Sequence, residues 1–131
     1  PSSEDIARFI VGCHRADVAF KATAGLHHAV RAEHPLTYEP DAPRGIMHGF
    51  LNVFIGAAMV RSLPGFEQDA CTEVLNETDA GAFIFEDQRV GWRDHWLDVT
   101  QLAQARESFA TGYGSCSFQE PVDALKQLGL L

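Results

Sequence analysis

Hydrophobic positions along the chain predict two long helices. Between residues 3 and 15, apolar residues return every three or four positions, and Ser2 with Asp5 forms a capping box before them. Residues 48–63 are apolar on nearly every face, and Pro64-Gly65 follows them. The first pattern is typical of an amphipathic helix. The second is typical of a helix buried on several sides, and we expect it to form the centre of the core.

Three shorter helices are predicted further along the chain. Residues 67–75 place four apolar side chains on one face. Asp98 and Gln101 form a second capping box, which predicts a helix from there to about Thr111. Glu120-Pro121 is typical of a helix start, so we expect a last short helix at the end of the chain.

Strands are fewer in this pattern, and we expect three or four. Residues 18–23 are apolar enough for an internal strand, and Gly25 marks its exit. Residues 83–85 and 90–92 flank four polar residues, which is typical of a β-hairpin. Residues 29–47 contain three prolines, so we expect a long loop there of the kind that often serves as a lid or binding segment. The predicted fold is a helix-rich α+β single domain with a small sheet that includes the hairpin.

Composition agrees with one domain over residues 1–131 and excludes two classes of partner. The chain is 46% hydrophobic and 21% charged, as in ordinary globular proteins. A net charge of −8 would repel nucleic acid. The apolar stretch 49–60 is far shorter than the roughly 20 residues of a membrane span. Cys13, Cys71 and Cys116 fit neither a disulfide framework nor a zinc site, so we expect a reducing, cytoplasmic location.

Candidate chemistry begins at the exit of the strand predicted over residues 18–23. Lys21, Thr23 and Gly25 lie where α/β proteins commonly place ligands. A lysine leaving an apolar strand would be desolvated, which favours an amine nucleophile able to form a Schiff base. The alternative interpretation is that Lys21 extends to solvent or pairs with a carboxylate.

Four histidines lie between Lys21 and the predicted core helix or at its start. His27 and His28 are adjacent and would point in opposite directions on an extended segment, so we expect at most one to face Lys21. Together with His34, His48 and nearby acidic residues they could supply a zinc or iron site. No recognised ligand spacing is present, and a hydrogen-bonding or general-base role is favoured.

Three further groups carry weaker hypotheses. His48 and Asn52 are four residues apart and would share one face of the predicted core helix, aimed at the Lys21 pocket. The alternative is that His48 caps the helix and Asn52 bonds a backbone group. Residues 113–117 place Cys116 between two serines, which we interpret as a structural turn. Trp92 and Trp96 are expected in the hairpin core or on a dimer surface.

The segment from Ala16 to Gly25 (ADVAFKATAG) resembles the Schiff-base strand of the deoxyribose-phosphate aldolase family. That resemblance implies an aldolase or lyase in which Lys21 is the nucleophile and a histidine is the general base.

A wider resemblance covers nearly the whole chain. The segments FKATAGLHH, MHGFLNVF and YGSCSFQEPVDALKQLGLL are similar to the C-terminal part of an uncharacterised bacterial family whose longer members look like α/β barrels. The resemblance implies that residues 20–25 are a late barrel strand with His27 and His28 at its mouth. A barrel takes 200 or more residues, so the chain would be a barrel fragment or a free-standing small protein, such as one from a mobile gene element. Either form would expose strand edges and favour a homodimer, with the hairpin or the Phe20 strand covered by the partner.

The leading functional hypothesis is therefore a dimeric small-molecule-binding or interaction module. Its pocket would be formed by Lys21, Thr23, His27, His28, His48 and Asn52. The aldolase-like enzyme is the alternative, and a purely structural protein is the third possibility. No cofactor is expected from the sequence.

Overall fold

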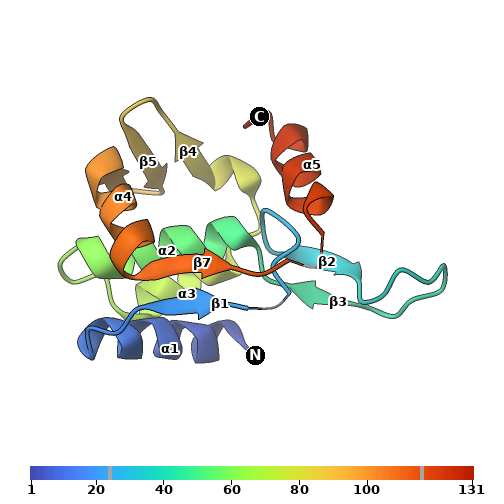
Figure 1. Ribbon diagram of the computed structural model, residues 1–131, viewed down its shortest axis with the longest axis horizontal. Helices are drawn as coiled ribbons and strands as arrows, with labels where there is room; N and C mark the ends of the chain where they lie inside the picture. The colour runs from blue at the N-terminus through green and yellow to red at the C-terminus, as the bar shows by residue number, and fades with distance from the viewer. Residues whose placement is uncertain (24, 116) are drawn as a thin grey trace.

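The computed structural model describes residues 1–23, 25–115 and 117–131. The helices are α1 (Ser3–Arg15), α2 (Phe50–Ser62), α3 (Gln68–Asn76), the 3-10 turn η1 (Ala80–Ala82), α4 (Val99–Ser108) and α5 (Gln119–Gln127). The strands are β1 (Phe20–Ala22), β2 (Ala32–Pro35), β3 (Arg44–Met47), β4 (Phe83–Phe85), β5 (Arg89–Trp92), β6 (His95–Asp98) and β7 (Ala110–Tyr113). The predicted α+β class is confirmed, although the described strands form three small sheets (Figure 1).

Helix α2 is the centre of the core, as predicted. Its neighbours are α1, α3 and α4, and most of its residues are buried. The helix begins at Phe50, two residues later than predicted, after Gly49 as its N-cap. Gly49 has no side chain to cap the helix, and the N–H groups of Phe50 and Leu51 instead donate to the carbonyls of His28 and Ala29, each at 2.9 Å.

Strands β1 and β7 form a parallel pair, which corrects two predictions. The helix predicted to run to Thr111 ends at Ser108, because the next residues are extended and pair with β1. The Phe20 N–H donates to the Phe109 carbonyl at 2.8 Å, and Phe109 is the residue that caps α4. β1 is also not internal. Among the described residues each of the two strands has only the other as a neighbour, and Val18 is 53% exposed.

The segment predicted as a long loop contains an antiparallel hairpin, so that prediction was wrong. β2 pairs with β3 over four residue pairs. The prolines do not prevent this pairing because Pro35 ends β2, while Pro40 and Pro43 lie in the connection. The Leu36 N–H donates to the Pro43 carbonyl at 2.8 Å and closes the hairpin.

The predicted β4–β5 hairpin is confirmed, and β6 adds a third antiparallel strand that was not predicted. Trp92 is 1% exposed and lies in the core. The ring of Trp96 lies against Gly91, where an added Cβ would come within 2.7 Å of it. The Arg89 guanidinium also stacks on the Trp96 ring, at 3.8 Å from the centroid.

Helix α5 follows β7, and the predicted last short helix is confirmed. Gly129 has a φ of 69°, and its N–H donates to the Lys126 carbonyl, as in a Schellman-type helix end. In Figure 1 this helix stands beside the carboxyl end of β7, above β2. No helix in the described part of the chain is long and apolar enough to cross a membrane.

Candidate functional site

The carboxyl ends of β1 and β7 meet at one edge of the parallel pair (Figure 1). The segment after β1 carries Thr23 and His27, and the segment after β7 carries Gly114 and Ser115. The two backbones come so close that a Cβ on Gly114 would lie 2.8 Å from the Thr23 carbonyl oxygen. Polar side chains from both strand exits therefore share a small volume, as at the ligand sites of parallel sheets.

His27 joins three parts of the fold at this edge. Its Nδ1 lies 2.9 Å from Oγ of Ser115 and 3.1 Å from Oε2 of Glu120. The other carboxylate oxygen of Glu120 accepts a hydrogen bond from the Tyr38 hydroxyl at 3.1 Å. One imidazole thus links the β1 exit to the β7 exit and to α5, and Glu120 connects that group to the β2–β3 turn.

Glu120 is held in place by the start of α5. It lies in the first helical turn, where a carboxylate interacts favourably with the helix dipole. Its backbone N–H donates to Oγ of Ser117 at 3.2 Å. Oε2 of Glu120 lies 3.1 Å from the His27 nitrogen, but it is buried and has no hydrogen bond among the described residues. A buried oxygen in this state has unused accepting capacity.

Two further imidazoles stack beside this group. The rings of His28 and His34 are 3.4 Å apart between centroids and nearly parallel, at 7°. Burial lowers the pKa of His28, and the nearby His34 lowers it further, while Glu120 opposes the shift. Burial also lowers the pKa of His34, and Arg44 adds to the effect. Both rings are therefore held in their neutral form near pH 7, which permits the close stack.

We call the hollow at this edge the histidine pocket. It has a volume of about 410 Å³, and the residues that define it here are His27, His28, Leu36, Tyr38, Met47 and Glu120. Both adjacent histidines line it, with ring centroids 6.4 Å apart at an angle of 69°. The expectation of opposite directions was made for an extended segment, and residues 25–28 do not form a regular strand, so both rings line one hollow.

The arrangement does not match a nucleophilic triad. In such a triad the hydroxyl and the carboxylate contact opposite nitrogens of the histidine. Here Ser115 and Glu120 both approach Nδ1 of His27, so the ring is oriented but Ser115 is not activated through it. Within the described residues, no three His, Cys, Asp or Glu side chains are grouped to hold a metal ion.

Lys21 lies in a different hollow, which we call the lysine pocket. It has a volume of about 340 Å³ and is lined by Lys21, His48, Ile6, Phe9, Phe20 and Ile46, among others. Lys21 is exposed, so the desolvation expected of a Schiff-base lysine is not seen. The structure brings Lys21 together with His48 and places His27 and His28 in the neighbouring pocket, with Met47 lining both.

Asn52 lies in neither pocket and is fully buried. Its Oδ1 accepts from the Arg31 N–H at 2.9 Å, and its Nδ2 donates to the carbonyls of Val74 and Glu77, both at 2.8 Å. The alternative in which Asn52 bonds the backbone is the one that fits. His48 precedes α2, so the prediction that it shares a helix face with Asn52 was wrong. Thr23 is exposed beside Gly114.

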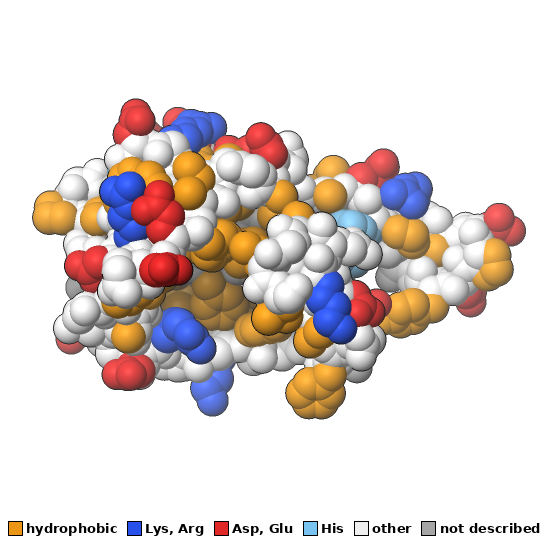
Figure 2. Space-filling view, turned by 90° about the horizontal axis from the view of Figure 1, so that it is seen from above, with side chains coloured by type: hydrophobic (Ala, Val, Ile, Leu, Met, Phe, Trp, Pro, Cys, Tyr) orange, Lys and Arg blue, Asp and Glu red, His pale blue; other side chains and the backbone are white. Residues whose placement is uncertain are grey.

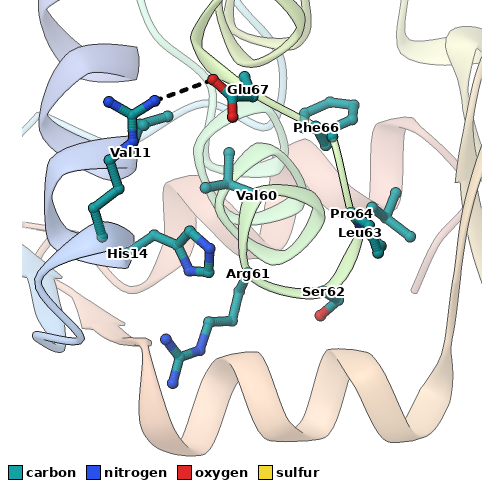
Figure 3. Close-up of a pocket in the computed structure, with 11 residues that line it drawn as sticks. Val11, His14, Val60, Arg61, Ser62, Leu63, Pro64, Phe66 and Glu67 are labelled. Atoms are coloured by element: carbon teal, nitrogen blue, oxygen red, sulfur yellow. Dashed lines mark hydrogen bonds and ion pairs between the residues drawn. The ribbon is translucent and has the colours of Figure 1, made fainter.

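A third hollow lies far from these groups, where α1 faces the end of α2 (Figure 3). Its charged side chains are already paired. Arg15 contacts Glu67 at 3.0 Å, and Arg61 contacts Asp17 at 2.8 Å. We assign no ligand to this hollow, because its cations have carboxylate partners within the chain.

Sequence reasoning missed Tyr38 and Glu120 as site residues. The sequence contains one local indication at Glu120, an acidic residue at a predicted helix start, but this indicates a helix and not a contact with His27. Its contact with His27 depends on how α5 folds back over the strand exits. The predicted turn over residues 113–117 includes Cys116, which lies outside the described residues.

Comparisons of the chain with models of protein families, with curated proteins and with solved structures found no match. The two resemblances described above therefore stay predictions.

Proposed function

We propose that the protein is a small-molecule-binding module and that the histidine pocket is its site. The observation that carries this proposal is the position of His27, which contacts Ser115 and Glu120 where two parallel strands end. Ligand sites in parallel sheets lie at this end of the strands. Ser115 and Glu120 orient the His27 ring, but the ring does not activate Ser115 as a nucleophile. This supports ligand binding over catalytic turnover.

The chemistry of the pocket favours a ligand that donates hydrogen bonds. Oε2 of Glu120, a residue that lines the pocket, is buried without a hydrogen bond among the described residues. A hydroxyl or ammonium group would satisfy the carboxylate oxygen, and the imidazole faces would pack against the carbon skeleton. We therefore propose a small hydroxylated or amino compound as the ligand.

A titration with defined probes tests this function. Ethanolamine, putrescine and ribose supply donors, while acetate and sulfate supply acceptors only. Ethanolamine or one of the other donors should shift the imidazole NMR signals of His27 and His28 in a saturable way, and Glu120→Gln should weaken that binding about fivefold. Glu4→Gln, which changes an exposed carboxylate at the start of α1, is the matched control. Binding of acetate in preference to every donor would contradict the proposal.

The Schiff-base enzyme is kept as a second candidate on one observation, the shared pocket of Lys21 and His48. Borohydride trapping with small aldehydes and ketones distinguishes it. A covalent adduct at Lys21 supports the enzyme, whereas no adduct, together with donor binding at the histidine pocket, supports the binding module.

We further propose that the protein forms a homodimer. Parallel strands are normally buried within larger sheets, yet β1 and β7 each lack a second neighbour among the described residues. An apolar groove of about 890 Å³ runs along β7, lined by Leu51, Phe54, Ala103, Tyr113 and Leu125. Figure 2 shows hydrophobic side chains on the floor of a hollow in the middle of this face. The groove adds a third candidate surface to the hairpin and the Phe20 strand.

Light scattering coupled to size-exclusion chromatography tests the dimer. Wild type should elute as a dimer at micromolar concentration, and Ala103→Glu should shift it to a monomer by placing a charge in the groove. Gln104→Glu changes the neighbouring exposed residue and should leave the dimer intact. A wild-type monomer would refute the homodimer.

A further inference from the structure

The lysine pocket lies along the edge of β1 that β7 does not cover. In Figure 1, β1 runs between α1 and β7, and β3 ends beside it. The ring of Phe9 in α1 meets the ring of Phe20 in β1 edge to face, at 5.4 Å between centroids. The pocket is therefore built from a helix face and a strand edge and does not depend on the histidine pocket.

Its walls are apolar and partly open to solvent. Ile6, Phe9, Phe20, Ile46 and Val53 supply most of the surface. Phe9 and Ile46 are each 54% exposed, although both are large hydrophobic side chains. Apolar surface at the rim of a hollow favours an occupant with an apolar body.

The charge of the pocket is opposite to that of the protein. The chain has 18 acidic and 10 basic residues, yet no Asp or Glu is among the residues that line this hollow. Lys21 lines it and makes no ion pair with any residue that the structure describes. An ammonium group beside apolar walls, without a carboxylate partner among the described residues, is suited to a carboxylate from a ligand.

His48 adds a second polar group with unused capacity. Its Nε2 lies 3.1 Å from the Pro1 carbonyl, so this nitrogen carries the proton and donates. Burial lowers the pKa of His48, which keeps the ring neutral near pH 7. Nδ1 is then an acceptor, and it is buried without a hydrogen bond among the described residues. Because Nδ1 accepts, it does not contact a carboxylate, and the preference of the pocket for an anion comes from Lys21.

We infer that the lysine pocket binds a small carboxylic acid with an apolar body. The carboxylate pairs with the Lys21 ammonium, and an aromatic or branched aliphatic body packs against Phe9, Phe20 and Ile46. The volume of about 340 Å³ lies near the lower end for ligand pockets, which limits the ligand to a small molecule such as a phenyl-substituted short-chain acid.

Three probes of the same shape test this inference by isothermal titration calorimetry. These probes are 3-phenylpropanoate, 3-phenylpropan-1-ol and 3-phenylpropan-1-amine. The acid should bind about fivefold more tightly than the alcohol, the effect of one ion pair at a partly exposed site, and the amine should bind more weakly still. Equal affinity for acid and alcohol, or no saturable binding of the acid at millimolar concentration, would overturn the inference.

Variants of Lys21 test whether the preference for the acid depends on its ammonium group. Lys21→Met should abolish the preference for the acid, and Lys21→Arg should keep it, because the charge is retained. Lys126→Met, on exposed α5, is the matched control and should bind like wild type. Lys21 is exposed, so Lys21→Met should keep the wild-type urea midpoint. A preference for the acid that survives Lys21→Met would also overturn the inference, whatever the result at the histidine pocket.

Discussion

The layer of α1, α2 and α3 and the region around the strand exits differ in how they treat buried polar groups. In the helical layer, Asn52 is fully buried and makes three hydrogen bonds to backbone groups. Ser3 is 4% exposed and donates to Oδ1 of Asn76 at 2.6 Å. These polar groups hold elements together, as expected of groups kept for stability.

The strand-exit region comprises residues 25–49, 113–115 and 117–127. Five buried side-chain polar atoms have no hydrogen bond among the described residues, and four of them lie here, on Arg31, His34, His48 and Glu120. The fifth belongs to His14 at the end of α1. Unsatisfied polar atoms lower stability, so their concentration in one region is the pattern of a site that a ligand completes.

Among the variants that test this difference between the two regions, Asn52→Leu should have the largest effect on stability. The change keeps an approximately similar volume but leaves the Arg31 N–H and the carbonyls of Val74 and Glu77 without their partner. We expect the free energy of unfolding to fall by about 3 kcal/mol, measured by urea denaturation. Gln104→Leu makes the same amide-to-leucine change on exposed α4 and should alter it by less than about 0.5 kcal/mol. If the two variants lowered the free energy of unfolding equally, Asn52 would not be a stabilising polar group of the helical layer.

Glycine substitutions test where the two regions touch. A Cβ on Gly49 would lie 2.4 Å from both the Ala29 carbonyl oxygen and the Val30 Cα, so Gly49→Ala should destabilise the fold by about 2 kcal/mol. Gly12 lies within α1 with nothing within 4 Å of such a Cβ, and Gly12→Ala should stabilise by about 0.5–1 kcal/mol. Thermal denaturation of both variants should show shifts of opposite sign.

The same contrast explains what the sequence could predict. The capping boxes at Ser2 and Asp98 and the apolar residues 50–62 are local patterns, and the helices that they predict are confirmed. β7 was missed because its residues continue a helical pattern, and only the pairing with β1 makes them extended. The β2–β3 hairpin was missed because its prolines were interpreted without their positions in the turn.

The site was harder to predict for the same reason. Lys21, His27 and His28 were found because chemistry-bearing residues followed a predicted strand. Their division between two pockets depends on β3 and α5, whose placement is a property of the whole fold. Glu120 and Tyr38 join the site from distant segments, and no local pattern contains that contact.

The pH dependence of stability should report the buried histidines of the strand-exit region. The pKa values of His28 and His34 are lower in the folded protein than the usual value of 6.5. The unfolded chain therefore binds more protons as the pH falls below about 6.5, and the free energy of unfolding decreases there. Urea midpoints should fall between pH 7 and pH 5. His34→Gln removes one of these groups and relieves His28, so it should flatten the decrease, while His48, whose pKa is also lowered, keeps part of it. An unchanged slope would show that the stack does not contribute.

The smallest effect should come from one carboxyl-to-amide change made in each region. Glu77 is 14% exposed, and its carboxylate accepts from the Trp92 indole N–H and from two backbone N–H groups, at 3.1 Å each. Glu77→Gln should therefore lower the free energy of unfolding by about 1 kcal/mol.

Glu120→Gln keeps the oxygen that accepts from Tyr38 and loses only the partly exposed contact with His27, so we expect a change within about 0.5 kcal/mol. Urea denaturation of the two variants side by side measures the difference. If Glu120→Gln were the more destabilising change, Glu120 would belong with the groups that hold the fold together. Its unsatisfied oxygen would then no longer argue for a ligand.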